Sequence, residues 1–167
     1  TGEGEHAIHD LVYYKQYLAN HKAEEDIKLH SFRLGYFFHL ICDIMWAKRI
    51  ATTTKQEFKS LFDHEPGKAI GIIKDDWYGL DQLYVREHPE SNFWRVIMVN
   101  PNPPSYLPFV KDAALHQQYE HIRKYYSSQE DHWFLSLPYQ YLNEKTMSRI
   151  VADSIAAVLY VHEKVQS

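Results

Sequence analysis

The chain has 167 residues, a length that fits one domain. A domain of this size can bury enough surface to need no disulfide or structural metal. With 18 Lys and Arg against 22 Asp and Glu, its formal charge is -4 and no basic run is present, which argues against a nucleic-acid backbone as the main partner. Aromatic residues make up 15% of the chain, so disorder is not expected.

The sequence also bears on the cellular compartment. The single cysteine, Cys42, cannot form an internal disulfide and lies in an apolar segment, where we expect a small core residue. No apolar run reaches eighteen residues and no signal-peptide pattern is present, so we expect no transmembrane segment and a cytoplasmic protein. Because the first residue is Thr1, we also expect that the full-length chain has a further N-terminal segment.

Helical spacing of apolar residues predicts the elements of the first half. A first helix is expected over residues 6–20, and a central helix begins near residues 24–27 and continues to residue 49. The run from Thr52 to Glu57 offers a Thr N-cap with an amide or acidic residue three positions later, so it predicts the start of a separate third helix.

The second half reads in the same way. Pro66-Gly67 predicts a turn, after which a helix is expected over residues 68–87. Three prolines make residues 99–105 a loop, and helices follow over residues 108–126 and from residue 143 or 146 to residue 165. The prediction is an all-α, single-domain bundle of about five to seven helices over residues 1–167.

The fourth helix has an apolar stripe that we expect to face inward. This stripe consists of Ile72, Ile73, Trp77, Leu80, Leu83 and Tyr84. We interpret the neighbouring Asp75 and Asp76 as surface carboxylates because they lie close to Lys74.

Two polar residues interrupt the otherwise apolar central helix. His39 and Asp43 are four positions apart, so they lie on one side of the helix about 6 Å from each other, with Gly35 one turn earlier leaving room above them. A buried imidazole and carboxylate need either a hydrogen bond to each other or a shared cation. The sequence leaves both interpretations open.

Two further groups carry the same chemistry. They are His9-Asp10 in the first helix and His116-x3-Glu120 in a later one, and nitrogen and carboxylate ligands from neighbouring helices are typical of metal sites in bundles. Their alternatives are a half-exposed helix start for His9 and a solvated helix face for His116 and Glu120, whose neighbours are polar.

The segment FRLGYFFHLICDIMW, residues 32–46, resembles the central helix of the bacterial zinc-dependent phospholipase C family, with Leu-Gly-Tyr, then His, then Asp, then Trp. The resemblance implies that His39 and Asp43 bind zinc, that His9 is a further ligand by order and spacing, and that His116 and Glu120 match a ligand pair by residue type. That family takes more ligands from an upstream segment, so we expect one or two ions, zinc or another divalent metal.

The function implied by this resemblance is hydrolysis of a small-molecule or lipid phosphate ester. A metal-bound water would attack phosphorus, with Asp43 as a ligand that also bridges ions and Asp10 either as a hydrogen-bond partner of a ligand or as the base that orients the water. The mouth of the site would be lined by Tyr13, Gly35, Tyr36, Trp46 and Trp77.

Two alternatives stay open. The adjacent His9 and Asp10 are also a feature of all-helical HD-type phosphohydrolases, although the central helix motif is not part of that pattern. The second alternative is a non-enzymatic, aromatic-rich helical binding module, in which the His and Asp residues form structural hydrogen bonds. The sequence does not predict an oligomeric state.

Overall fold

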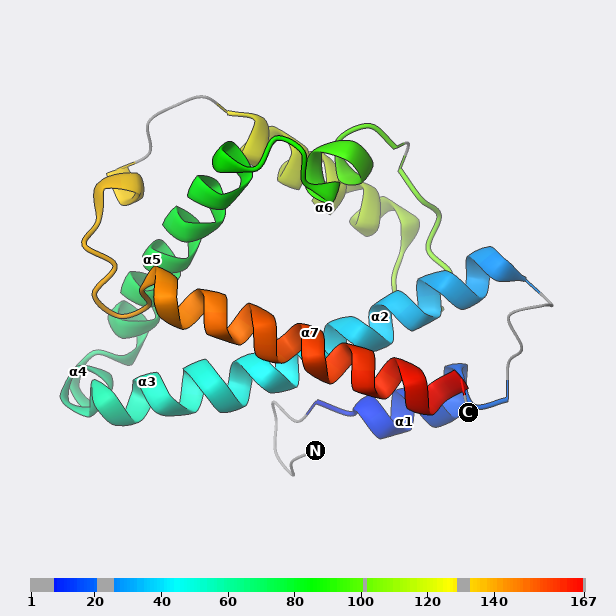
Figure 1. Ribbon diagram of the computed structural model, residues 1–167, viewed down its shortest axis with the longest axis horizontal. Coiled ribbons are helices and arrows are strands. Elements are labelled where there is room, and N and C mark those ends of the chain that lie inside the picture. The colour runs from blue at the N-terminus through cyan, green and yellow to red at the C-terminus, as the bar shows by residue number, and fades with distance from the viewer. Residues whose placement is uncertain (1–7, 21–25, 101, 129–132, 167) are drawn as a thin grey trace. The chain divides into compact units, whose positions relative to one another are not determined.

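A computed structural model describes residues 8–20, 26–100, 102–128 and 133–166. Within these ranges the chain forms seven α-helices and no strand. The helices, labelled in Figure 1, are α1 (Asp10–Tyr17), α2 (Ile27–Trp46), α3 (Thr52–Glu57), α4 (Lys59–His64), α5 (Pro66–Glu87), α6 (Asp112–Ser127) and α7 (Glu144–Gln166). The predicted all-α class with five to seven helices is confirmed.

Contacts group the chain into two compact units, Thr1–Ser60 with Lys145–Ser167, and Leu61–Glu144. Each unit has its own buried apolar residues. Those of the first unit include Tyr13, Leu18, Phe37, Ile41, Ile50 and Ile150, and those of the second include Ala69, Leu80, Val85, Leu107 and Leu142. The boundaries expected for a single domain, 1–167, stay a prediction.

In the first unit, α1 packs against α2 through aromatic rings. The ring of Tyr13 lies 5.0 Å from that of Tyr36, and the ring of Tyr14 lies 5.5 Å from that of Phe37. The start of α2 is fixed by Asp26, whose side chain accepts hydrogen bonds from two backbone N–H groups of the first turn, as an N-cap Asp does. The start expected near residues 24–27 therefore has a local cause.

A π-helical turn, Ala47–Ala51, joins α2 to α3 without a break in the helical backbone. The hydroxyl of Thr52 donates to the carbonyl of Ala47 at 3.0 Å, and the residue before α3 makes no side-chain cap. The predicted Thr N-cap of a separate helix is therefore wrong. Because the backbone stays helical through the turn, the first N–H groups of α3 need no side-chain partner.

The last helix, α7, returns along α2 within the first unit (Figure 1). The ring of His162 lies 5.8 Å from that of Phe38, and the Arg49 Nε atom lies 3.5 Å from an Asp153 carboxylate oxygen. Since Phe38 meets His162 whereas the later residue Arg49 meets the earlier residue Asp153, α7 runs antiparallel to α2. Ile150 is buried on this face of α7.

In the second unit, α5 begins at Pro66 rather than after it. Pro is favoured at the first helical position because its missing N–H would have no partner there, so the predicted Pro66-Gly67 turn is instead the first turn of the helix.

The buried face of α5 also differs from the predicted stripe. Tyr84 is exposed, whereas the polar residues Asp76 and Gln82 are buried. Each of these two side chains has backbone partners: Asp76 accepts from the N–H groups of Tyr141 and Leu142, and the Gln82 amide donates to a backbone carbonyl of α6. Burial of a polar group is tolerated when it is hydrogen-bonded, so the prediction of Asp76 as a surface carboxylate is wrong.

The helix predicted over residues 108–126 begins four residues later, at Asp112. The Asp112 carboxylate accepts a hydrogen bond from the N–H of Ser105 at 2.6 Å. The Ser105 hydroxyl in turn lies 3.2 Å from the backbone of Leu107, which is buried. These contacts hold the chain before α6 in a non-helical path.

Candidate functional site

His39 and Asp43 lie on one face of α2, as the spacing predicts. The His39 Nε2 atom is 3.3 Å from Asp43 Oδ2, and the side chains are 59% and 46% exposed. The expectation that the pair lies in an apolar environment is therefore wrong. The buried residues of α2 are Phe37 and Ile41, which turn the His39–Asp43 face toward solvent.

The distance between the two donor atoms suits a metal ion. One edge of a tetrahedron around a zinc ion with bonds of about 2.0–2.1 Å is about 3.3–3.4 Å long. The ring of Tyr36 lies edge-on, 5.8 Å from the His39 ring, and restricts its orientation. In the described part of the chain, however, no third His, Cys, Asp or Glu joins the pair. A catalytic zinc takes three protein ligands, so the described residues do not complete such a site.

The expected ligand and base from α1 have different environments. His9 precedes the helix as its N-cap residue and is exposed, whereas Asp10 lies in the first turn and is buried. The described residues do not bring either side chain into a group of three with His39 and Asp43. Their assignments as metal ligand and base stay predictions.

Tyr13 and Tyr36, two of the expected lining residues, contact each other, and Tyr36 also contacts His39. The Tyr13 hydroxyl donates to the Arg33 carbonyl at 3.1 Å, and burial raises the pKa of this phenol. Tyr13 is 6% exposed, so it is part of the packing between α1 and α2.

The other expected lining residues lie elsewhere. A Cβ atom at Gly35 would meet no atom within 4 Å, so the space around the pair does not require glycine there. Trp46 is partly buried at the end of α2, and Trp77 lies on α5 in the second unit.

His116 and Glu120 hold the loop before α6. The His116 Nε2 atom lies 3.0 Å from the Pro103 carbonyl, and a Glu120 oxygen accepts from Asn102 at 3.3 Å and from Arg123 at 3.2 Å. The Arg123 guanidinium also donates to backbone carbonyls of the chain preceding this loop. Both predicted ligands thus have structural hydrogen-bond partners, and their metal role stays a prediction.

A partly buried carboxylate that the sequence analysis did not assign to a site is Asp81 on α5. The Tyr126 hydroxyl donates to it at 3.3 Å, and burial raises its pKa to about 6, although hydrogen bonds from Tyr126 and Trp77 oppose this shift. The sequence places Asp81 one turn beyond Trp77. No pattern in the sequence predicts that Asp81 or Trp77 contacts Tyr126, which is 45 positions away from Asp81.

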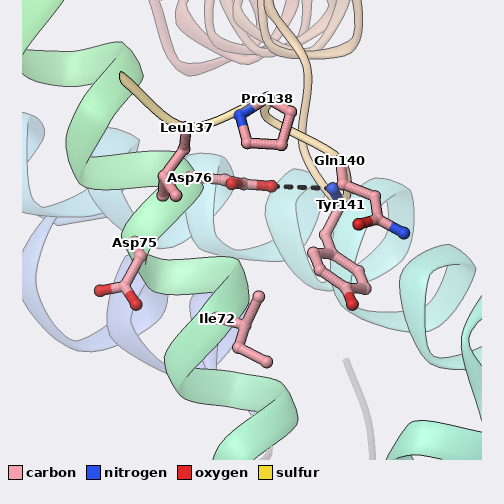
Figure 2. Close-up of a pocket in the computed structure, with 7 residues that line it drawn as sticks. All are labelled: Ile72, Asp75, Asp76, Leu137, Pro138, Gln140 and Tyr141. Carbon is pink, nitrogen blue, oxygen red and sulfur yellow. Dashed lines mark hydrogen bonds between the residues drawn. The ribbon is translucent and has the colours of Figure 1, made fainter. Parts of the chain in front are cut away.

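The second unit also contains a pocket of about 240 Å³, drawn in Figure 2. One wall is α5, with Ile72 and Asp75, and the other is the segment that follows the short 3-10 helix Trp133–Ser136, with Leu137, Pro138 and Tyr141. Its surface is mainly apolar, and no Lys, Arg or His lines it.

Asp76 joins these two walls. One of its carboxylate oxygens accepts from the N–H groups of Tyr141 at 2.8 Å and Leu142 at 3.0 Å, the first of which is dashed in Figure 2. Burial and, secondarily, the Asp76 charge raise the pKa of Asp75. The pocket therefore has apolar walls and a negative potential, which suits a small ligand that is neutral or positively charged.

Comparisons with known proteins add no relative: the chain matches no family model, no curated protein and no solved structure. Across the described ranges, none of the helices combines the length and the apolar composition that crossing a membrane requires.

Proposed function

We propose that this protein is a metal-dependent hydrolase of phosphate esters and that His39 and Asp43 supply two ligands to its divalent ion. The substrate class, a small-molecule or lipid phosphate ester, follows from the resemblance of residues 32–46 to the zinc-dependent phospholipase C family. A cytoplasmic location belongs to the same proposal.

One observation carries the proposal: an imidazole nitrogen and a carboxylate oxygen lie 3.3 Å apart on one helix face. That separation equals the spacing of two ligands around a tetrahedral ion. The exposure of both side chains leaves room for a substrate and further ligands. The HD-type alternative has no comparable pair, since exposed His9 and buried Asp10 differ in environment.

The experiment measures zinc binding and hydrolysis together. Protein purified without an affinity tag or chelator is dialysed against zinc and tested on p-nitrophenyl phosphate, bis(p-nitrophenyl) phosphate and phosphatidylcholine micelles. We expect about one zinc per chain, and His39→Ala or Asp43→Ala should remove it and reduce kcat/KM by roughly 100-fold or more. EDTA should abolish turnover and zinc should restore it.

A matched control is available in the chain. His88 and Glu90 form a second exposed pair, with 3.1 Å between His88 Nδ1 and a Glu90 oxygen, but on a turn after α5. His88→Ala should leave zinc content and turnover unchanged. Turnover that survives both EDTA and His39→Ala would refute a metal-dependent hydrolase. Equal zinc loss in the His39 and His88 variants would refute zinc binding at His39 and Asp43.

A further inference from the structure

The pocket in the second unit contains a buried carboxylate whose protein partners satisfy only one of its oxygens. Asp76 lines this pocket and is 3% exposed. Its Oδ2 atom accepts from the N–H groups of Tyr141 and Leu142, whereas no described residue donates to its Oδ1 atom. A carboxylate has about four acceptor positions, so Oδ1 is available to a ligand in the pocket.

No cationic side chain in the described part of the chain balances this charge. No Lys, Arg or His of the described residues lines the pocket, and none of them forms an ion pair with Asp76. Asp75 adds a second carboxylate to the same pocket, and burial, followed by the charge of Asp76, raises its pKa. A buried charge is costly unless it is paired, so the pocket favours a positively charged group.

The walls of the pocket favour an organic cation over a metal ion. They are formed by Ile72 of α5 and by Leu137, Pro138 and the ring of Tyr141 opposite it (Figure 2). Mg²⁺ and Ca²⁺ prefer a shell of six or more oxygen atoms, which apolar walls do not offer. The described residues also contain no group of three metal-binding side chains. A hydrocarbon body attached to the charge would instead pack on these walls.

The volume and the free acceptor narrow the ligand further. The pocket measures about 240 Å³, below the roughly 300–1,000 Å³ of pockets that hold drug-sized molecules, so the ligand is small. Pro138 and Gln140 line it and are exposed, so it opens to solvent. An oxygen that lacks a donor favours an ammonium with N–H groups over a quaternary one, because only the former can form a charge-assisted hydrogen bond.

We propose that this pocket binds a small primary amine. Its ammonium group donates to Asp76 Oδ1, and its short apolar or aromatic body packs on Ile72 and Leu137. All residues of this site belong to the second unit, whereas His39 and Asp43 belong to the first. The amine site needs no metal ion, so it does not depend on the proposed hydrolase.

The first test compares ligands of one shape and different charge. The full chain is titrated in a calorimeter with 2-phenylethylamine, which is protonated at pH 7, in buffer with EDTA so that no metal ion takes part. We expect a Kd of about 0.1–1 mM, ordinary for so small a ligand. The neutral 2-phenylethanol should bind at least about tenfold more weakly, and phenylacetate should not bind. Equal affinity for amine and alcohol, or no amine binding at about 10 mM, would overturn the proposal.

The second test removes the charge of the acceptor. Asp76→Asn keeps an oxygen for the two backbone N–H groups and should weaken amine binding at least about tenfold, with the affinity for 2-phenylethanol unchanged. Glu87→Gln removes an exposed carboxylate from the same helix and is the matched control, which should bind the amine as the wild type does.

A third variant does not touch the buried carboxylate. Gln140→Lys adds a cation at an exposed lining position and should weaken amine binding roughly tenfold by like-charge repulsion. Gln117→Lys, at an exposed position of α6, is its control and should have no effect. Wild-type affinity in both Asp76→Asn and Gln140→Lys would refute this site.

Amide NMR of the full chain locates the ligand. The Tyr141 and Leu142 signals should shift when the amine is added, because their N–H groups share its carboxylate partner. Shifts confined to the first unit would place the amine elsewhere. Without EDTA, displacement of the amine by about 1 mM Mg²⁺ would make the pocket an ion site instead. Tighter binding of Nα-acetyl-lysine amide than of 2-phenylethylamine would assign the pocket to a lysine side chain of a partner protein.

Discussion

At the scale of single residues, the His39–Asp43 and Asp81–Tyr126 contacts differ in how far apart their two residues lie in the sequence. His39 and Asp43 are one turn apart, so the helix itself brings them to 3.3 Å. Asp81 and Tyr126 meet because α5 and α6 pack together. This second contact holds the Asp81 carboxylate in a partly buried position, where its charged form is disfavoured.

Asp81 should make stability depend on pH. Its pKa is about 6 in the folded state against an ordinary value of 3.8, so between these values the folded state binds more protons than the unfolded state. The free energy of unfolding should therefore fall as pH rises from about 4 to about 6, by roughly 3 kcal/mol for this group. Asp81→Asn should remove that slope and be the more stable variant at pH 7.

Urea unfolding of wild type and variant at intervals between pH 4 and pH 7 measures this difference. Glu87→Gln, at an exposed position of the same helix, is the control and should follow the wild-type curve. Parallel curves for wild type and Asp81→Asn would show that Asp81 keeps its ordinary pKa.

At the scale of elements, the helices were predictable where their causes are local. The start of α2 has such a cause, since the Asp26 cap depends on neighbours in the sequence. The start of α5 at Pro66 is also a local signal, but the turn expected at Pro66-Gly67 missed it. The buried face of α5 was not predictable, because Asp76 and the Gln82 amide nitrogen are hydrogen-bonded to backbone groups more than 40 residues away. The exposure of His39 and Asp43 has the same origin, since it depends on which helices cover α2.

Asp76 should be essential for holding the segment that follows the 3-10 helix against α5. Asp76→Ala removes the acceptor for the N–H groups of Tyr141 and Leu142 and should lower the free energy of unfolding by about 2–4 kcal/mol, the loss expected for two unsatisfied buried donors. Asp76→Asn retains an acceptor oxygen and should lose less. Denaturant unfolding gives the magnitudes, and amide exchange of Tyr141 and Leu142 locates the effect.

Asp75→Asn changes the neighbouring carboxylate that lines the same pocket and should leave both amides protected. If Asp76→Ala is as stable as wild type, the segment is held by its apolar contacts, chiefly by buried Leu142.

At the scale of the whole molecule, the all-α class and the order of the long helices follow from the sequence, because apolar periodicity is a local signal. The division into two units was not expected. It follows from which helices contact each other: the first unit brings α7 back onto α2 across the intervening 84 residues, Leu61–Glu144, which form the second unit.

If each unit is also a cooperative folding unit, a cavity in one unit should leave the stability of the other unit unchanged. Ile50 and Leu142 are 2% and 1% exposed and belong to the first and second units, respectively. Ile50→Ala and Leu142→Ala should each cost about 2–5 kcal/mol, and each loss should be confined to the unit that contains the cavity. Hydrogen exchange with mass spectrometry should then show faster exchange of α2 and α7 peptides in Ile50→Ala, and of α5 and α6 peptides in Leu142→Ala. Faster exchange of all four helices in both variants would mean that the units unfold together, because a single global opening then exposes every amide.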